Sequence, residues 1–380
     1  MKKMMKRMLC ALFVCTCIAL SAIGAADIAI ADMVYLLPDG TTDAPAFARI
    51  DYSQGQSKAT ATVFGIPLKK TDVSELKSAI VIPGGQSFGV RLGIRGAIVS
   101  GVGTVVTDNG ACSPGKDAGL RVNDLITCVN GEEIDNSEGF ISAVRDSGGK
   151  ALDIKYKRGK TEIETKLLPV SDESGVYKAG VWVKDTVAGI GTLTYVTEDG
   201  EFGGLGHGIC DPLTGEALPF ERGEIFDAHI TGVKRGRSGD PGELCGYFGK
   251  DRKGDVRLNT DTGVFGKMSA IPDGTPIGIA LKNKVKEGNV KILCTVDGEG
   301  VREYDAQITC ILSRESDTKN FIVRITDKEL LAKTGGIVQG MSGSPIIRNG
   351  MLIGAITHVL VNDPTRGYGI FIENMLKYSE

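Results

Sequence analysis

The stretch Gly340-Met341-Ser342-Gly343-Ser344-Pro345, near the C-terminus, combines the residue types that a nucleophilic serine site needs. Glycine at position 340 lets the backbone turn so that the N–H groups of Gly340 and Ser342 converge on one developing oxyanion. Ser344 is a competing nucleophile, but it lacks the glycine two residues earlier that Ser342 has. The pattern therefore predicts acyl-transfer chemistry at Ser342, typical of a hydrolase.

A serine hydroxyl is a weak nucleophile until a base removes its proton, so this chemistry requires a histidine. The chain has three, His207, His229 and His358. Glycines on both sides of His207 allow close approach to its imidazole, which suits a base. His229 lies in an alternating, strand-like segment and is predicted to be structural, whereas His358 is expected to line the substrate pocket rather than act as the base.

Composition indicates a globular, glycine-rich protein. The 380 residues are 42% apolar and 24% charged, enough for two or three domains that each bury a core. Fifty-two glycines with only 6% aromatic residues indicate many tight turns, as in all-β domains. A net charge of −3 gives no long-range attraction for nucleic acid.

No ligand spacing for zinc appears, and no cofactor is expected. The nine cysteines contain no CxxC pair, and those beyond the N-terminal segment are predicted to be small buried apolar residues rather than a disulfide framework.

The N-terminus has the composition of a targeting segment. Basic residues at positions 2, 3, 6 and 7 precede an uncharged, mostly apolar run that ends at Ala26. Residues 1–26 are predicted to be either a cleaved signal peptide or a membrane anchor, and the chain beyond them is expected to be extracytoplasmic. Residues 27–80 are interpreted as a spacer with a helix-compatible patch near 71–78.

Residues 81–170 show a compact series of short strands, two short helices and a final hairpin. Ser113-Pro114 predicts a helix start, Asn130-Gly131 a type I′ turn, and 137–145 a helix. The series resembles a PDZ domain in the bacterial permuted form, most specifically at 113–126. In PDZ domains an x-Φ-Gly-Φ loop captures a peptide C-terminus, and Phe88-Gly89-Val90 match it, which implies a peptide ligand. The alternative is that Phe88 and Val90 are ordinary strand residues.

Residues 171–380 are predicted to form an all-β peptidase domain. The order of His207 and then Ser342 resembles that of a chymotrypsin-like double β-barrel and not that of an α/β-hydrolase, whose nucleophile precedes its histidine. More specifically, 82–87, 205–208, 339–346, 357–359 and 362–370 resemble the stage IV sporulation protein B peptidase family. The resemblance covers nearly everything from residue 80 onward.

The resemblance implies a triad of His207, Asp327 and Ser342, with an oxyanion hole at Gly340 and Ser342. Asp327 lies closer to the serine than the acid of chymotrypsin-like enzymes does, and Asp211 and Asp317 remain alternatives. Residues 334–338 lie where related barrels form the floor of the primary pocket. They are small and uncharged there, which weighs against a preference for basic residues.

The family resemblance also implies a role. Its peptidases are secreted across the inner membrane of the forespore and cleave membrane-anchored regulators in the intermembrane space, which leads to activation of sigma factor K; they also cleave themselves. A quality-control protease of the HtrA type is the rival, disfavoured because its peptidase precedes its PDZ domain. A non-catalytic PDZ scaffold is disfavoured by the presence of His207 and Ser342.

Overall fold

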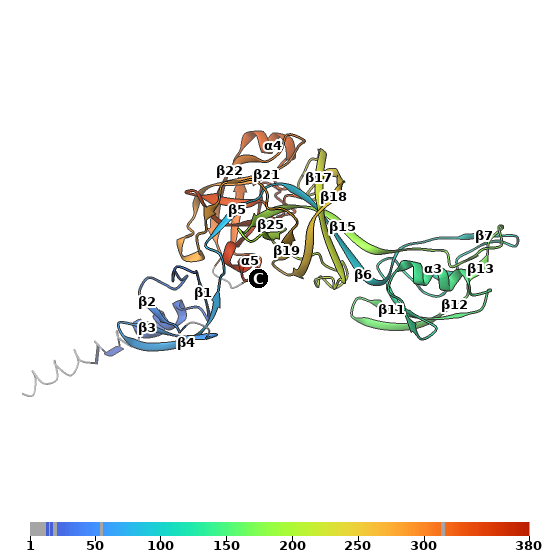
Figure 1. Ribbon diagram of the computed structural model, residues 1–380, viewed down its shortest axis with the longest axis horizontal. Coiled ribbons are helices and arrows are strands. Elements are labelled where there is room, and N and C mark those ends of the chain that lie inside the picture. Colours follow the sequence, from blue (N-terminus) through green and yellow to red (C-terminus); the bar gives the residue numbers. More distant parts are fainter. Residues whose placement is uncertain (1–12, 15, 18–20, 54–55, 313–315, 380) are drawn as a thin grey trace, which may run out of the picture.

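The structure is a computed structural model that describes residues 13–14, 16–17, 21–53, 56–312 and 316–379. Three parts follow one another along its longest axis (Figure 1): a small N-terminal sheet, a central pair of β-barrels, and a PDZ domain at the far end. The expectation of a mainly β protein with a PDZ domain and a chymotrypsin-like double barrel is confirmed.

The first barrel is a closed ring in which the pairing of its first and last strands completes the circle. Its core contains Phe88, Leu92, Phe202 and Val264, all buried. In ring order the strands are β6 (Ser87–Val102), β17 (Arg222–Lys234), β18 (Glu243–Thr260), β19 (Gly263–Met268), β16 (Glu201–Gly204) and β15 (Val181–Val196).

The second barrel is closed as well, and buried residues alternate with more exposed ones along most of its first three strands, as the period of a strand facing one core requires. Helix α4 (Lys328–Thr334) lies between its third strand and the Ser342 loop, and α5 (Ile372–Leu376) ends the chain. In ring order the strands are β21 (Gly288–Cys294), β22 (Arg302–Ile311), β23 (Phe321–Ile325), β26 (Arg366–Phe371), β25 (Met351–Val359) and β24 (Pro345–Arg348).

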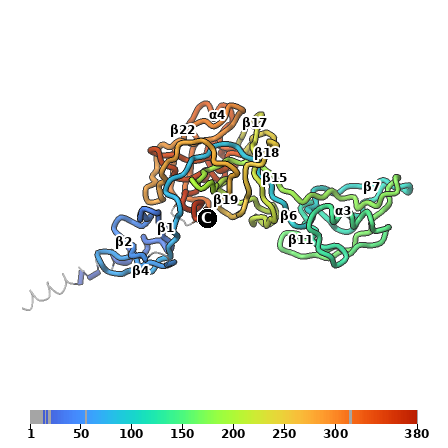
Figure 2. Tube along the Cα trace, viewed as in Figure 1, coloured from blue at the N-terminus to red at the C-terminus, as the bar shows by residue number. Residues whose placement is uncertain are grey.

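The PDZ domain is inserted into the first barrel. Strands β6 and β15 run side by side out of the barrel, as the traces in Figures 1 and 2 show, and their outer halves belong to the PDZ domain. Between them lie β7 (Val105–Thr107), β8 (Gly110–Cys112), α2 (Pro114–Asp117), β9 (Leu125–Val129), β10 (Glu132–Glu133), α3 (Ser137–Arg145), β11 (Leu152–Arg158), β12 (Thr161–Leu167), β13 (Val170–Ser171) and β14 (Tyr177–Lys178).

This insertion differs from the predicted division at residue 171. Strand β5 (Ile80–Pro83) and the first half of β6 precede the PDZ domain in sequence but pair with barrel strands β15 and β17. The peptidase unit therefore begins before the PDZ domain and resumes after it. Pairing between strands about 100 residues apart leaves no local sequence signal.

Local predictions within the PDZ domain are confirmed. Helix α3 spans the predicted 137–145, and the Asn136 side chain caps it by accepting a hydrogen bond from the Gly139 N–H. The Asn130-Gly131 turn has positive φ at both residues, 53° and 83°, as a type I′ turn requires.

The N-terminal region is folded rather than a plain spacer. Its four strands, β1 (Met33–Leu36), β2 (Ala48–Asp51), β3 (Lys58–Val63) and β4 (Ile66–Glu75), form a sheet in the order β1-β4-β3-β2. The predicted helix-compatible patch near 71–78 is wrong where it overlaps β4, because residues 71–75 pair in this sheet with β1 and β3. The loop between β1 and β2 contacts the segment before β21 through Asp43, whose carboxylate pairs with Lys282.

Most of the predicted signal or anchor segment, 1–26, lies outside the described residues. Residues 21–29 are helical. In the part of the chain that the structure describes, no helix has the length and apolarity needed to cross a membrane. The described cysteines are all unpaired, and Cys128 and Cys294 are buried as predicted, whereas Cys210 and Cys245 are exposed.

Because the PDZ domain is inserted into the first barrel, we predict that the two barrels fold without it. Gly93 pairs with Thr186 where β6 and β15 leave the barrel, so we replace residues 95–184 with Asn-Gly, which closes the two strands as a type I′ hairpin. We expect a cooperatively folded protein by circular dichroism and thermal melting. A matched truncation that starts at residue 171 lacks β5 and β6 and should not fold. The insertion would be contradicted if the truncation folded and the replacement did not.

Candidate active site

The loop that carries Ser342 depends on two glycines in left-handed conformations. Gly340 has φ 96° and Gly343 has φ 94°, values that favour glycine. A Cβ at position 340 would lie 3.0 Å from the Leu244 side chain, and one at position 343 would collide with the Thr192 carbonyl oxygen. The predicted role of Gly340 in turning the backbone beside Ser342 fits this geometry.

The two serines of the loop occupy different environments. Ser342 is half-buried and lines a cavity, and its hydroxyl donates a hydrogen bond to the Thr357 carbonyl oxygen at 2.7 Å. Ser344 is fully buried, and its hydroxyl donates to the Met341 carbonyl oxygen at 2.6 Å, closing the turn. The structure thus gives Ser344 a place in the fold and leaves Ser342 facing a ligand-sized space.

His207 faces the same cavity because the chain before it turns sharply. Leu205 and Gly206 both have positive φ, 67° and 68°, and for a leucine this conformation is uncommon. The His207 Nδ1 lies 2.9 Å from the Gly208 carbonyl oxygen. Since a carbonyl only accepts, this bond places the proton on Nδ1 and leaves the Nε2 lone pair free. Burial lowers the pKa of His207 below its usual value, which favours the neutral ring.

His358 packs against His207, with the two ring centroids 4.9 Å apart. Its Nδ1 is buried and has no hydrogen-bond partner among the described residues. Burial, followed by the neighbouring His207, lowers the pKa of His358 to about 4, so this ring is neutral near pH 7. His358 lines the cavity, as expected from the sequence. Over the described ranges, no group of three or more His, Cys, Asp or Glu side chains is arranged to hold a metal ion.

The cavity between the barrels has a volume of about 500 Å³ and an uncharged lining, with both histidines taken as neutral. Ile337 and Val338, from the segment predicted to form the pocket floor, line the cavity together with Thr357 and Val359 of β25, and so do His207 and Ser342. The N–H groups of Gly340 and Ser342 have no acceptor within the described part of the chain, so both are available to an oxyanion.

The structure does not bring Asp327 to His207. Asp327 is the N-cap of α4: one carboxylate oxygen accepts from the Leu330 N–H at 2.9 Å and the other from the Asp305 N–H at 3.3 Å. The predicted triad acid therefore holds a helix end, and the Gly208 carbonyl is the group that orients His207.

The structure also locates the two alternative acids, Asp211 and Asp317. Asp211 closes its own turn by accepting from the Leu213 and Thr214 N–H groups. Asp317 lines a second cavity together with His207 and His358, but no hydrogen bond joins it to either ring among the described residues.

The predicted peptide-capturing loop is wrong. Phe88, Gly89 and Val90 lie within β6, inside the first barrel, where β15 pairs on one side and β17 on the other. Phe88 is buried, and a Cβ on Gly89 would lie 2.6 Å from the Phe248 ring. With both strand edges occupied, these residues have no free N–H groups to offer, and the alternative of ordinary strand residues is the correct one.

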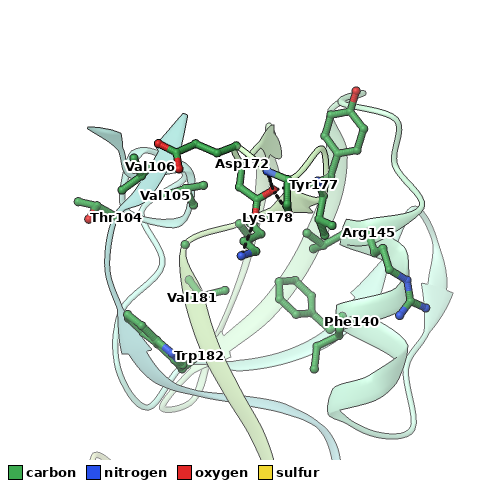
Figure 3. Close-up of a pocket in the computed structure, with 17 residues that line it drawn as sticks. Thr104, Val105, Val106, Phe140, Arg145, Asp172, Tyr177, Lys178, Val181 and Trp182 are labelled. Atoms are coloured by element: carbon green, nitrogen blue, oxygen red, sulfur yellow. Dashed lines mark hydrogen bonds and ion pairs between the residues drawn. The ribbon is translucent and has the colours of Figure 1, made fainter. Parts of the chain in front are cut away.

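The PDZ domain instead has a groove of about 790 Å³ between α3 and the start of β15 (Figure 3). Val181 and Trp182 lie on the strand, and Phe140 and Ile141 on the helix. Ala179-Gly180-Val181 carries the Φ-Gly-Φ pattern there, with Gly180 at φ 66°. The sequence contained this signal, but it follows the PDZ core instead of preceding it.

Two family models match the chain. A family model described as SpoIVB peptidase S55 matches residues 175–376, and a PDZ domain model matches 105–158. Among solved structures, the PDZ domain of the SdrC-like protein from Listeria innocua is 27% identical, with a TM-score of 0.20, over 23% of this chain and 92% of that chain.

A second solved structure, the active form of the Rv3671c protease from M. tuberculosis, is 14% identical with a TM-score of 0.30. The match covers 51% of this chain and 74% of that chain. Because the S55 match spans more than half of the 380 residues and includes both His207 and Ser342, this chain belongs to the SpoIVB peptidase S55 family, as a serine protease that contains a PDZ domain.

Proposed function

We propose that this chain is a serine endopeptidase in which Ser342 is the nucleophile and His207 the general base. The observation that carries the proposal is that both side chains line one uncharged cavity, with the His207 Nε2 free to accept a proton. The free N–H groups of Gly340 and Ser342 support it, because they are the donors that a tetrahedral oxyanion requires.

The mechanism follows from these positions. The Ser342 hydroxyl leaves the Thr357 carbonyl, gives its proton to His207 and attacks the peptide carbonyl of the substrate. The N–H groups of Gly340 and Ser342 stabilise the oxyanion, each contributing about 10²- to 10³-fold in rate. His207 then protonates the leaving amine, and water hydrolyses the acyl-enzyme. The Gly208 carbonyl holds the Nδ1 proton throughout.

The cavity supports a preference for apolar side chains at the cleaved bond, because Ile337, Val338 and Val359 line it and no carboxylate of the described residues does. We infer that the substrates are extracytoplasmic segments of membrane-anchored regulatory proteins, cleaved in the forespore intermembrane space during sporulation, and that the chain also processes itself. The family match supports this part of the proposal.

We also propose that the PDZ groove binds an extended peptide. Between Val181 and Gly191 strand β15 pairs only with β6 among the described residues, so its other edge is open to an added strand. The groove offers apolar contacts from Ile141, 42% exposed, and Trp182, 62% exposed. Peptides that end in an apolar residue fit this lining.

Replacement of Ser342 by alanine tests the nucleophile. We expect Ser342→Ala to lower peptide turnover by up to about 10⁶-fold and to abolish self-processing. Labelling of the unmodified protein with a fluorophosphonate, followed by peptide mapping, should place the adduct on Ser342. An adduct on Ser344, or self-processing that continues in Ser342→Ala, would refute the assignment.

Replacement of Asp327 distinguishes a role as a helix cap from a role as the triad acid. Serine is also a good N-cap, so Asp327→Ser should keep both stability and activity, whereas Asp327→Ala should cost about 1 kcal/mol of folding free energy with little change in kcat. Thermal melting and peptide hydrolysis measure the two effects. If Asp327 orients the imidazole, both variants should lose about 10⁴-fold in kcat at unchanged stability, which is the result that would contradict the structure.

The PDZ groove can be tested with the single tryptophan of the chain, Trp182, which lines it. We expect its fluorescence to change on titration with peptides that end in valine or leucine. Ile141→Lys places a charge in the groove and should weaken binding at least tenfold. Val122→Lys is the matched control, because Val122 is 50% exposed but does not line the groove. Equal weakening in both variants would show that the groove is not the binding site.

A further inference from the structure

Thr192 of β15 joins the two segments that carry the candidate catalytic residues. Its backbone N–H donates to the Ser342 carbonyl at 2.9 Å, and its hydroxyl donates to the Gly340 carbonyl at 2.8 Å. Its own carbonyl accepts from the Leu205 N–H, two residues before His207, at 3.2 Å. Thr192 is fully buried, so these bonds are made away from solvent.

The two bonds from Thr192 to carbonyl groups fix two peptide units. These two units flank the peptide unit that contains the Ser342 N–H. The Gly340 carbonyl belongs to the unit that joins 340 to 341, and the Ser342 carbonyl to the unit that joins 342 to 343. The N–H of Ser342 belongs to the unit between them. With its neighbours held toward β15, this unit keeps one orientation, and the nucleophile keeps its backbone position.

The hydroxyl bond matters most at Gly340. Glycine crosses easily between left- and right-handed conformations, so a peptide unit next to a glycine flips at low cost unless it is tied down. Gly340 sits at φ 96°, where its N–H is free for an oxyanion. The Thr192 hydroxyl is the side-chain donor that holds the carbonyl of this residue.

We propose that Thr192 is a positioning residue for acyl transfer, acting through the Gly340 and Ser342 backbone to hold the oxyanion donors in place. This inference rests on the proposed function of Ser342. Thr192 does not line the substrate cavity, so its effect falls on the transition state and not on substrate binding.

The test compares Thr192→Val with the unmodified full chain. Valine keeps the shape and the backbone N–H of threonine and removes only the hydroxyl bond to Gly340. With a fluorophosphonate as the probe, we expect the maximal rate of Ser342 labelling to fall by about 10- to 100-fold, the order of one weakened oxyanion donor. The probe concentration for half-maximal rate should stay within about twofold, and Thr192→Ser should recover the rate to within about threefold.

Thr194→Val is the matched control. Thr194 lies on the same strand, is equally buried, and its hydroxyl donates to the Gly343 carbonyl at 2.7 Å, beyond the nucleophile. Both valine variants lose one buried hydroxyl bond, so their melting temperatures should fall alike, while only Thr192→Val should lose labelling rate to the expected extent.

The outcomes separate the two proposals. Labelling of Thr192→Val at the unmodified rate, or an equal loss in Thr194→Val, overturns the positioning role and leaves Ser342 as the nucleophile. A rise in half-saturating concentration without a fall in maximal rate also overturns it. Failure of the unmodified protein to label at Ser342 overturns the proposed function, and the role of Thr192 with it.

Discussion

The hydrogen bonds between strand β15 and the Ser342 loop are the contact on which the candidate site depends. The loop is rich in glycine, and a glycine-rich segment loses more conformational freedom on ordering than other segments do. Bonds from Thr192 to the carbonyls of Gly340 and Ser342 supply the order that the loop's own sequence lacks. The glycines in turn make the contact possible, because any side chain at position 343 would collide with the Thr192 carbonyl. The first barrel thus shapes a candidate site whose proposed nucleophile belongs to the second.

The same strand reaches both functional regions of the molecule. Strand β15 begins at Val181 in the PDZ groove, its residues from 187 to 190 line the cavity beside His207, and it ends beyond Thr192. A PDZ domain joined by a flexible linker would leave no such continuity. Here the connection is a pair of hydrogen-bonded strands, β6 and β15, because the domain is inserted into the barrel rather than placed before it.

Signals carried by neighbouring residues predicted structure well. The α3 helix and the Asn130-Gly131 turn depend on a few adjacent residues, and both were predicted from the sequence. Pairings between distant segments were not. Phe88 looked like the start of a peptide-binding loop because its partners, at 191 and 227, are supplied by strands far along the chain. Asp327 shows the reverse, because here the local signal was correct. An aspartate immediately before a helix is a typical N-cap, but the prediction followed the family pattern instead.

The His207 Nδ1 is bonded to a carbonyl and not to a carboxylate, so other groups set the relative stability of the neutral and charged forms of the ring. Burial lowers its pKa, so the ring is neutral and ready to accept a proton at neutral pH. The same burial disfavours the imidazolium that the proposed attack by Ser342 would form. The hydrogen bond to the Gly208 carbonyl acts in the other direction, because the negative end of that dipole faces the Nδ1 proton and favours the charged ring. A carbonyl stabilises that charge less than a carboxylate does, since it carries only a partial charge. In the proposed mechanism, the oxyanion donors at Gly340 and Ser342 would then supply more of the transition-state stabilisation, so the geometry of their loop becomes the decisive feature of the site.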